Sequence, residues 1–227
     1  MAYELLKKIE KPIRGVLFDM DGVVIDSERL YTRFWMEAAA DLGFPMTLEQ
    51  GLQLRSLSRS ACQAKLESFF GPAVSYDRVR ARRIELMDVY IAEHGVEGKP
   101  GIRELLAYLR ERGFPCAITC SSAIRVIEQH LGRLGLLDFF TALRSGKDVP
   151  KGKPAPDIYL EGAAAIGLAP ENCLAIEDSP AGLEAAWRAG CMGVFVPDQA
   201  PPDEVTLSRC TARADSLIDV MELIQKM

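Results

Sequence analysis

Histidine is scarce in this sequence, and its cysteines form no metal-binding pattern. The 227 residues include only two histidines, His94 and His130, which lie far apart in the chain. The six cysteines contain no C-x-x-C pair. These absences exclude a histidine-rich zinc site and a two-histidine motif. Several cysteines stand in apolar runs, where a free thiol behaves as a small hydrophobic side chain, and this usage favours a reducing compartment.

The sequence also lacks a basic excess and a long apolar run. Lysine and arginine total 27 against 32 aspartates and glutamates, for a net charge of −5. This balance gives no electrostatic signal for nucleic acid or anionic lipid. No apolar stretch is long enough to span a membrane, and the start, MAYELLKK, has no small-residue cleavage site. We therefore expect a cytoplasmic protein with neither nucleic acid nor a membrane as its partner.

What the sequence does contain is the alternating pattern of an α/β protein. Apolar runs of strand length recur with amphipathic stretches between them, and the 48% hydrophobic content is that of a globular chain. The pattern predicts an open, mostly parallel, Rossmann-like sheet. The predicted strands are residues 15–18, 116–118, 142–144, 173–176 and 193–196, with helices at 102–112, 123–134, 158–166, 182–189 and in the tail from 215 to 224.

One segment breaks this alternation. From about residue 27 to residue 95 the sequence predicts helices only, at 29–42, 48–54, 59–70 and 77–94. Glycines suited to hinges stand at its two ends, Gly22 on one side and Gly95, Gly98 and Gly101 on the other. We therefore predict a core domain made of residues 1–25 and 97–227, with a small all-helical cap domain of residues 26–96 inserted into it.

Acidic pairs follow two of the predicted strands. Asp19 and Asp21 come directly after the first strand, with Gly22 behind them, and Glu177 and Asp178 follow the fourth. A single D-x-D sequence is usually a turn or a helix cap, but ligands of open α/β sheets bind at the carboxyl ends of strands, where both pairs are expected. Carboxylates gathered there repel each other unless a cation lies among them. All-oxygen ligation favours a hard ion, and Mg²⁺ is the usual choice beside a phosphate.

Hydroxyl groups and a lysine follow two other strands. Thr119, Cys120, Ser121 and Ser122 come after the second predicted strand, and Lys153 precedes a predicted helix. Hydroxyls and backbone amides at a helix N-terminus, together with a lysine, form an anion site. Taken alone, these residues are a helix cap and a solvated loop charge. Beside the acidic pairs they predict a phosphate site.

Such a site can transfer a phosphoryl group through an aspartyl-phosphate. A carboxylate beside a metal ion and a phosphate can act as a nucleophile, while the cation and the lysine offset charge on the transferring oxygens. A second carboxyl group can protonate the leaving oxygen and then deprotonate the attacking water. Asp19 and Asp21 fit these two roles, with Lys153 as the charge stabiliser.

Three motifs resemble those of the haloacid dehalogenase (HAD) superfamily. Residues 18–28 (FDMDGVVIDSE) resemble its first motif, and residues 153–159 (KPAPDIY) and 176–182 (IEDSPAG) resemble its third and fourth, in order and with the usual spacing. The pattern is similar to that of the β-phosphoglucomutase-like phosphatases, which carry a helical cap just after the first motif. The resemblance implies an enzyme, a HAD-type phosphatase with this cap.

The same resemblance implies a role for each motif residue. Asp19 is expected to be the nucleophile and Asp21 the general acid and base. Mg²⁺ is expected on the Asp19 side chain, the Asp21 backbone carbonyl and Asp178, with Glu177 in support. Lys153 is expected to contact the phosphate.

Two positions depart from the family pattern. Cys120 stands where the second motif usually has serine or threonine. We therefore expect the Ser121 amide to bind the phosphate, with the hydroxyl of either Ser121 or Thr119 replacing the missing one. Tyr31 stands where the mutases of this group have a histidine, and this favours hydrolysis over return of the phosphoryl group to a sugar.

The cap segment 55–59 (RSLSR) resembles the substrate-specificity loop of the family. Arg59 is either a solvated residue at a helix start or the partner of a second anionic group on the substrate. The side chains that select the substrate are expected on the cap, with Tyr31, Trp35, Arg55, Arg59, Arg82 and Arg83 as candidates.

The predicted function is that of a Mg²⁺-dependent phosphomonoester hydrolase. Its expected partner is a small phosphate ester, with a sugar phosphate favoured, and the protein is expected to be a monomer or a weak oligomer. One alternative is a β-phosphoglucomutase-type phosphomutase that uses the same Asp19 and Asp21. Another is a non-catalytic protein that binds a phosphate ligand, which ranks last because both aspartates are present.

Overall fold

The chain divides into two compact units. The computed structural model describes residues 3–9, 11–54, 57, 59–198 and 202–226. The first unit is formed by residues 1–26 with 97–227, and the second is Ser27–Val96. Their predicted roles as catalytic core and cap stay predictions.

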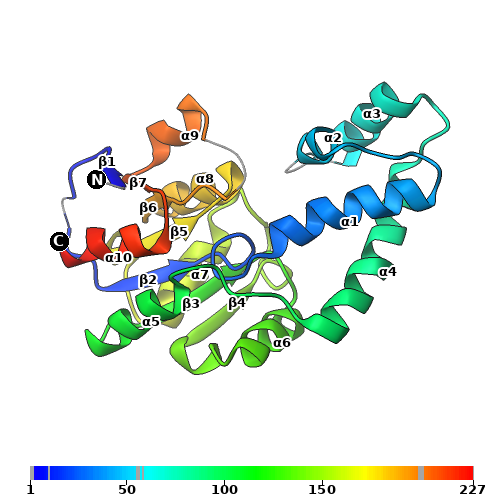
Figure 1. The fold of residues 1–227 in the computed structure, drawn as a ribbon. Coiled ribbons are helices and arrows are strands. Elements are labelled where there is room, and N and C mark those ends of the chain that lie inside the picture. Colours follow the sequence, from blue (N-terminus) through cyan, green and yellow to red (C-terminus); the bar gives the residue numbers. More distant parts are fainter. Residues whose placement is uncertain (1–2, 10, 55–56, 58, 199–201, 227) are drawn as a thin grey trace. The chain divides into compact units, whose positions relative to one another are not determined.

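A seven-stranded sheet is the centre of the first unit (Figure 1). The spatial order is β1-β7-β6-β5-β2-β3-β4, in which β1 runs antiparallel to β7 and every other neighbouring pair is parallel. This sheet confirms the predicted α/β fold. Its strands are β1 (Tyr3–Leu5), β2 (Gly15–Phe18), β3 (Cys116–Cys120), β4 (Ala142–Ser145), β5 (Cys173–Glu177), β6 (Met192–Phe195) and β7 (Ala212–Ala214).

Strands β2, β3 and β5 lie together inside the sheet and are buried along their whole length. Strands covered on both faces are continuous apolar runs, which is why the sequence predicted them. Phe18 of β2 pairs with Ile118 of β3 on one side and Ile176 of β5 on the other. The chain passes from β2 to β3 and β4 and later enters β5 on the opposite side of β2, so the switch point of the sheet lies here. The carboxyl ends of these three strands therefore define the expected ligand position.

Helices connect these strands. Helix α7 packs on β2, β3, β4 and α8, while α5 packs on α10. Helix α8 begins directly after β5, because the Ser179 hydroxyl accepts a hydrogen bond from the Gly182 amide and Pro180 occupies the first turn. The helices of this unit are α5 (Ile102–Glu111), α6 (Ile124–Leu134), α7 (Asp157–Ala165), α8 (Pro180–Ala189), α9 (Glu204–Arg209) and α10 (Leu217–Gln225), with short 3-10 turns η1 (Leu137–Phe139) and η2 (Pro170–Asn172).

The second unit contains helices α1 (Ser27–Asp41), α2 (Leu48–Leu52), α3 (Arg59–Phe70) and α4 (Tyr76–His94). Helix α1 packs along α4 and α2. The unit has a hydrophobic core of its own, with Ala38 and Leu66 among its buried members. A capping box of Thr47 and Gln50 starts α2. The helices predicted for this segment are confirmed to within a few residues.

Two strands and one α-helix of the first unit were not predicted. Strands β1 and β7 have three residues each, and helix α9 has six. Segments this short carry too little periodicity to be recognised from sequence. Strand β1 completes the edge of the sheet by pairing with β7, a contact between the two ends of the chain.

Candidate active site

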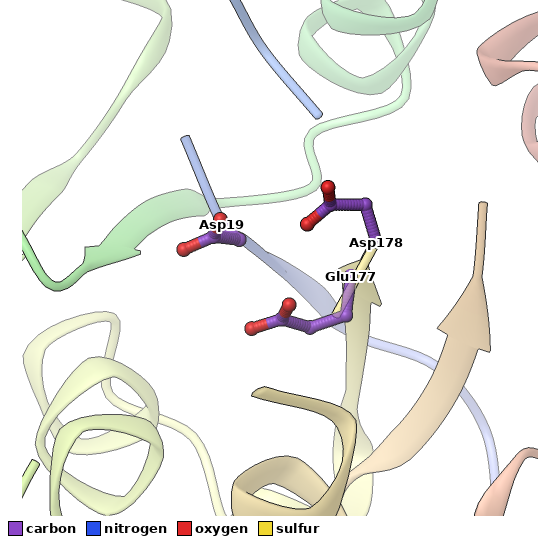
Figure 2. Close-up of side chains that lie close together, drawn as sticks. All are labelled: Asp19, Glu177 and Asp178. Carbon is purple, nitrogen blue, oxygen red and sulfur yellow. The ribbon is translucent and has the colours of Figure 1, made fainter. Parts of the chain in front are cut away.

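Asp19 lies at the carboxyl end of β2 (Figure 2). Its amide donates to the Ile176 carbonyl of β5 at 3.0 Å, which fixes the point where the chain leaves the sheet. The following residues form a tight turn, because the amides of Val24 and Ile25 both donate to the Met20 carbonyl. Gly22 within this turn has a φ of 78°, a conformation that glycine adopts without strain.

Three carboxylates gather at this edge of the sheet. One oxygen from each of Asp19, Glu177 and Asp178 lies within 4.8 Å of the others (Figure 2). Asp178 packs against the turn after β2, since a Cβ built on Gly22 would lie 2.2 Å from its Oδ2 atom. A larger residue at position 22 would therefore displace the Asp178 carboxylate as well as strain the turn.

Lys153 supplies positive charge to this cluster. Its Nζ atom donates to Asp19 Oδ1 and to Glu177 Oε1, both at 2.6 Å. The side chains of Lys153 and Glu177 are 8% and 0% exposed. Burial acts against the charged lysine, but the charges of Asp19 and Glu177 raise the pKa of Lys153 well above its ordinary value. The lysine therefore stays protonated between the two carboxylates.

The donor set fits a hard divalent cation. Burial raises the pKa of Asp19 to about 7, with Lys153 acting in the opposite direction and the charges of Glu177 and Asp21 raising it further. One lysine therefore does not balance the acidic groups, and a cation beside Asp19 would favour its charged form. The ligand atoms offered are carboxylate oxygens, which suit Mg²⁺.

Glu177 is more enclosed than the two aspartates. Its Oε1 atom accepts hydrogen bonds from Lys153 Nζ and from the Tyr159 hydroxyl, and its Oε2 atom accepts one from Ser179 Oγ at 3.1 Å. A Cβ built on Gly182 would lie 1.9 Å from Oε1, so the glycine of the fourth motif makes room for this carboxylate. Tyr159 closes the KPAPDIY motif, but no pattern in the sequence marks it as part of the site.

The two predicted phosphate donors, Thr119 and Ser121 at the carboxyl end of β3, differ in their exposure. Thr119 is fully buried, and its Oγ1 atom donates to the Phe18 carbonyl of β2 at 3.1 Å. Ser121 is exposed. A hydroxyl that is buried against a neighbouring strand does not face a ligand, so Ser121 is the better placed of the two predicted phosphate donors.

Cys120 and Ser122 contact the second aspartate of the DMDG sequence. Asp21 Oδ2 lies 3.5 Å from Cys120 Sγ and 3.4 Å from Ser122 Oγ. Burial raises the pKa of Cys120 well above its ordinary value, so this residue is a neutral thiol beside the carboxylate. The structure thus brings the first and second motifs together through Asp21, a contact that sequence analysis did not predict.

In the second unit, Arg59 is paired with Asp77. Its Nε atom donates to Asp77 Oδ1 at 3.0 Å, and a second bond joins the guanidinium to Oδ2. The Arg59 side chain is 73% exposed, so an anion that binds it must share it with Asp77. The Tyr31 ring lies beneath the Arg83 guanidinium, whose Cζ atom is 4.7 Å from the ring centroid. Arg55, another candidate for substrate selection, lies outside the described residues.

Known proteins resemble this chain over most of its length. A family profile described as a haloacid dehalogenase-like hydrolase matches residues 13–190. Hexitol phosphatase B from Escherichia coli O157:H7 is 31% identical over 216 residues, which cover 92% of this chain and 95% of that protein. β-Phosphoglucomutase from Bacillus subtilis strain 168 is 31% identical over 197 residues, covering 83% of this chain and 85% of that protein.

A solved structure shows the same fold. A HAD-family hydrolase from Deinococcus radiodurans R1, with bound phosphate and sodium, has a TM-score of 0.81 and 27% identity to this chain. The match covers 95% of this chain and 96% of that one. Together with the relatives named phosphatases, these similarities confirm the family resemblance and the prediction of an enzyme.

Proposed function

This chain belongs to the haloacid dehalogenase-like hydrolases, and we propose that it is a Mg²⁺-dependent phosphatase of a small phosphorylated metabolite, with a sugar phosphate favoured. The observation that carries the proposal is the contact of Lys153 with Asp19 beside Asp178, at the carboxyl ends of β2 and β5. The proposed nucleophile, a positive charge and the proposed metal ligands therefore lie close together. The relatives named hexitol phosphatase and β-phosphoglucomutase support a sugar phosphate as the substrate.

The first step transfers the phosphoryl group to Asp19. A carboxylate oxygen of Asp19 attacks the phosphorus atom, and the bond between phosphorus and the ester oxygen breaks. The Asp21 carboxyl group gives its proton to that oxygen, so the alcohol leaves uncharged. Cys120 and Ser122, which contact Asp21 Oδ2, orient this acid.

The second step returns Asp19 to its starting state. The Asp21 carboxylate, now without its proton, accepts a proton from a water molecule. The water oxygen attacks the phosphorus atom, the bond from phosphorus to the Asp19 oxygen breaks, and inorganic phosphate leaves. Asp21 ends protonated and Asp19 ends as a carboxylate, so the cycle balances.

Charge on the transferring oxygens is stabilised from two sides. Lys153 contributes its ammonium group, and the amide and hydroxyl of Ser121 contribute hydrogen bonds. The side chains of Asp19 and Asp178, with the backbone carbonyl of Asp21, are the proposed Mg²⁺ ligands. When bound, Mg²⁺ offsets negative charge on the phosphoryl oxygens.

A phosphomutase is the second candidate, because the relative from Bacillus subtilis carries that name. It would use the same Asp19 and Asp21 but return the phosphoryl group to a sugar hydroxyl. Tyr31, which stands where the mutases of this group have a histidine, favours water as the acceptor. Hydrolysis is therefore the first proposal.

We also propose that the enzyme acts in a reducing compartment, namely the cytoplasm. All six cysteines are free and buried. Such thiols persist where disulfides do not form. Within the described ranges, the structure contains no helix with the length and apolar character to cross a membrane.

The test is release of inorganic phosphate from a panel of sugar phosphates, hexitol phosphates, nucleotides and p-nitrophenyl phosphate, with Mg²⁺ or with EDTA. We expect turnover that requires Mg²⁺ and ranks the sugar derivatives first. A requirement for a sugar bisphosphate, with an isomeric sugar phosphate as product, would support the phosphomutase. Absence of both activities would leave the non-catalytic binding protein.

A further inference from the structure

Tyr159 is a fully buried side chain beneath the carboxylate cluster. It lies in the first turn of α7, the helix that packs on β2, β3 and β4. A buried tyrosine hydroxyl requires a hydrogen-bond partner. Its partner here is Glu177 Oε1, the same oxygen atom that accepts from Lys153 Nζ.

The ring of Tyr159 also faces the lysine. Lys153 Nζ lies 5.2 Å from the ring centroid, a distance at which the π face attracts a cation. The ammonium group is thus bounded by Asp19, by Glu177 and by this ring. Tyr159 therefore contacts both members of the Lys153–Glu177 pair.

These contacts determine the position of the Lys153 ammonium group. The Glu177 carboxylate is held by the Tyr159 and Ser179 hydroxyls, and Gly182 leaves no space behind it. Without the phenol, Oε1 would keep Lys153 as its only donor. The buried carboxylate would then attract the ammonium more strongly and draw it away from Asp19.

We propose that Tyr159 is a positioning residue, which holds Glu177 as the counter-ion of Lys153 and thereby places the lysine beside the phosphoryl group. This inference rests on the proposed phosphatase function. It assigns the Oε1 atom of Glu177 to the lysine, because this oxygen already accepts hydrogen bonds from both Lys153 and Tyr159, whereas Oε2 accepts only one, from Ser179. Mg²⁺ binding should then depend on Asp178 and not on Tyr159.

The experiment compares wild type with Tyr159→Phe, Asp178→Asn and the matched control Tyr108→Phe, which removes a hydroxyl from the half-buried Tyr108 of α5. For each folded protein we measure kcat, KM and the Mg²⁺ concentration that gives half of the maximal rate. Tyr159→Phe should lower kcat about 10- to 100-fold, as expected for one hydrogen bond to a charged group. Its half-saturating Mg²⁺ should equal that of wild type, whereas Asp178→Asn should raise this concentration.

A second measurement needs no turnover. Calorimetric titration with MgCl2, followed by inorganic phosphate, should show wild-type affinity for Mg²⁺ and weakened affinity for phosphate in Tyr159→Phe. Urea unfolding identifies the folded fraction, so a loss of stability alone is not mistaken for a loss of positioning.

Two results would overturn the inference. One is a Tyr159→Phe protein with wild-type kcat and phosphate affinity, and the other is a rise in half-saturating Mg²⁺ as large as that of Asp178→Asn. Failure of the wild-type enzyme to release phosphate would instead count against the proposed function, and the calorimetric comparison would still decide the role of Tyr159.

Discussion

Gly182 and Glu177 are in such close contact that a Cβ on the glycine would lie 1.9 Å from a carboxylate oxygen. Since this carboxylate anchors Lys153, a side chain at position 182 should disturb both packing and the site. Gly182→Ala is expected to destabilise the protein by about 1–3 kcal/mol, the usual cost of overpacking, and to lower kcat. Urea unfolding and phosphate release measure the two effects.

Gly132 is the matched control for that substitution. It lies on α6, is exposed, and a Cβ there would meet no atom within 4 Å. Gly132→Ala should leave turnover unchanged and stabilise the protein by about 0.5–1 kcal/mol. Equal effects of the two substitutions would contradict the packing described for Gly182.

Lys153 lies between the buried carboxylates of Asp19 and Glu177. Lys153→Met would leave Asp19 and Glu177 without their shared partner. Removing one member of a buried ion pair costs about 3–5 kcal/mol. Urea unfolding in EDTA should show a loss of this size, together with loss of phosphate binding in calorimetry. A variant as stable as wild type would mean that the two carboxylates do not depend on the lysine.

The hydroxyls of Thr119 and Ser121, at the carboxyl end of β3, should respond differently to removal. Ser121→Ala is expected to raise KM and the inhibition constant of inorganic phosphate, because Ser121 is the exposed hydroxyl. Thr119→Val should leave both constants unchanged and lower the free energy of unfolding by about 0.5–1.5 kcal/mol, since Thr119 donates to the Phe18 carbonyl. The opposite assignment of kinetic effects would show that Thr119 reaches the phosphate.

The cysteine thiols should be unreactive in the folded protein. Burial raises the pKa of Cys116 to about 12 and the pKa of Cys173 and Cys210 to about 11. A raised pKa leaves little thiolate near pH 8, and the thiolate is the reactive form. Ellman's reagent should therefore react slowly with native protein and promptly with all six thiols in urea. Rapid reaction of any thiol in the native state would contradict this burial.

The sequence predicted the central strands because burial on both faces requires continuous apolar runs, as in GVLF before Asp19. It also predicted that Asp19, Glu177 and Asp178 lie together, since two acidic pairs follow strands whose carboxyl ends meet at one edge of the sheet. Strands β1 and β7 could not be predicted, because three-residue edge strands exist only through their pairing with each other and with the sheet.

The sequence also did not predict which way the side chains point at the strand ends. The second strand was predicted to end at residue 118, but β3 extends to Cys120. Thr119 is therefore a strand residue whose side chain points to one face of the sheet, while Ser121 begins the loop. The predicted end of this strand was two residues too early, and this difference determines which hydroxyl is available to bind a phosphate.

The contacts of Tyr159 and Cys120 depend on tertiary packing. Tyr159 reaches Glu177 only because α7 packs on β2, the neighbour of β5, and Cys120 reaches Asp21 only because β2 and β3 are adjacent. Neither contact has a periodicity or spacing along the chain that would predict it.

The central claim is that Asp19 receives the phosphoryl group, and acid quenching during turnover tests it most directly. Wild type, Asp21→Asn and Asp19→Asn are mixed with Mg²⁺ and the best substrate of the panel, quenched, digested and analysed by mass spectrometry. We predict one phosphoryl group on the peptide that contains Asp19, more of it in Asp21→Asn, and neither phosphorylation nor turnover in Asp19→Asn. Phosphate release by a folded Asp19→Asn protein at the wild-type rate would contradict the mechanism.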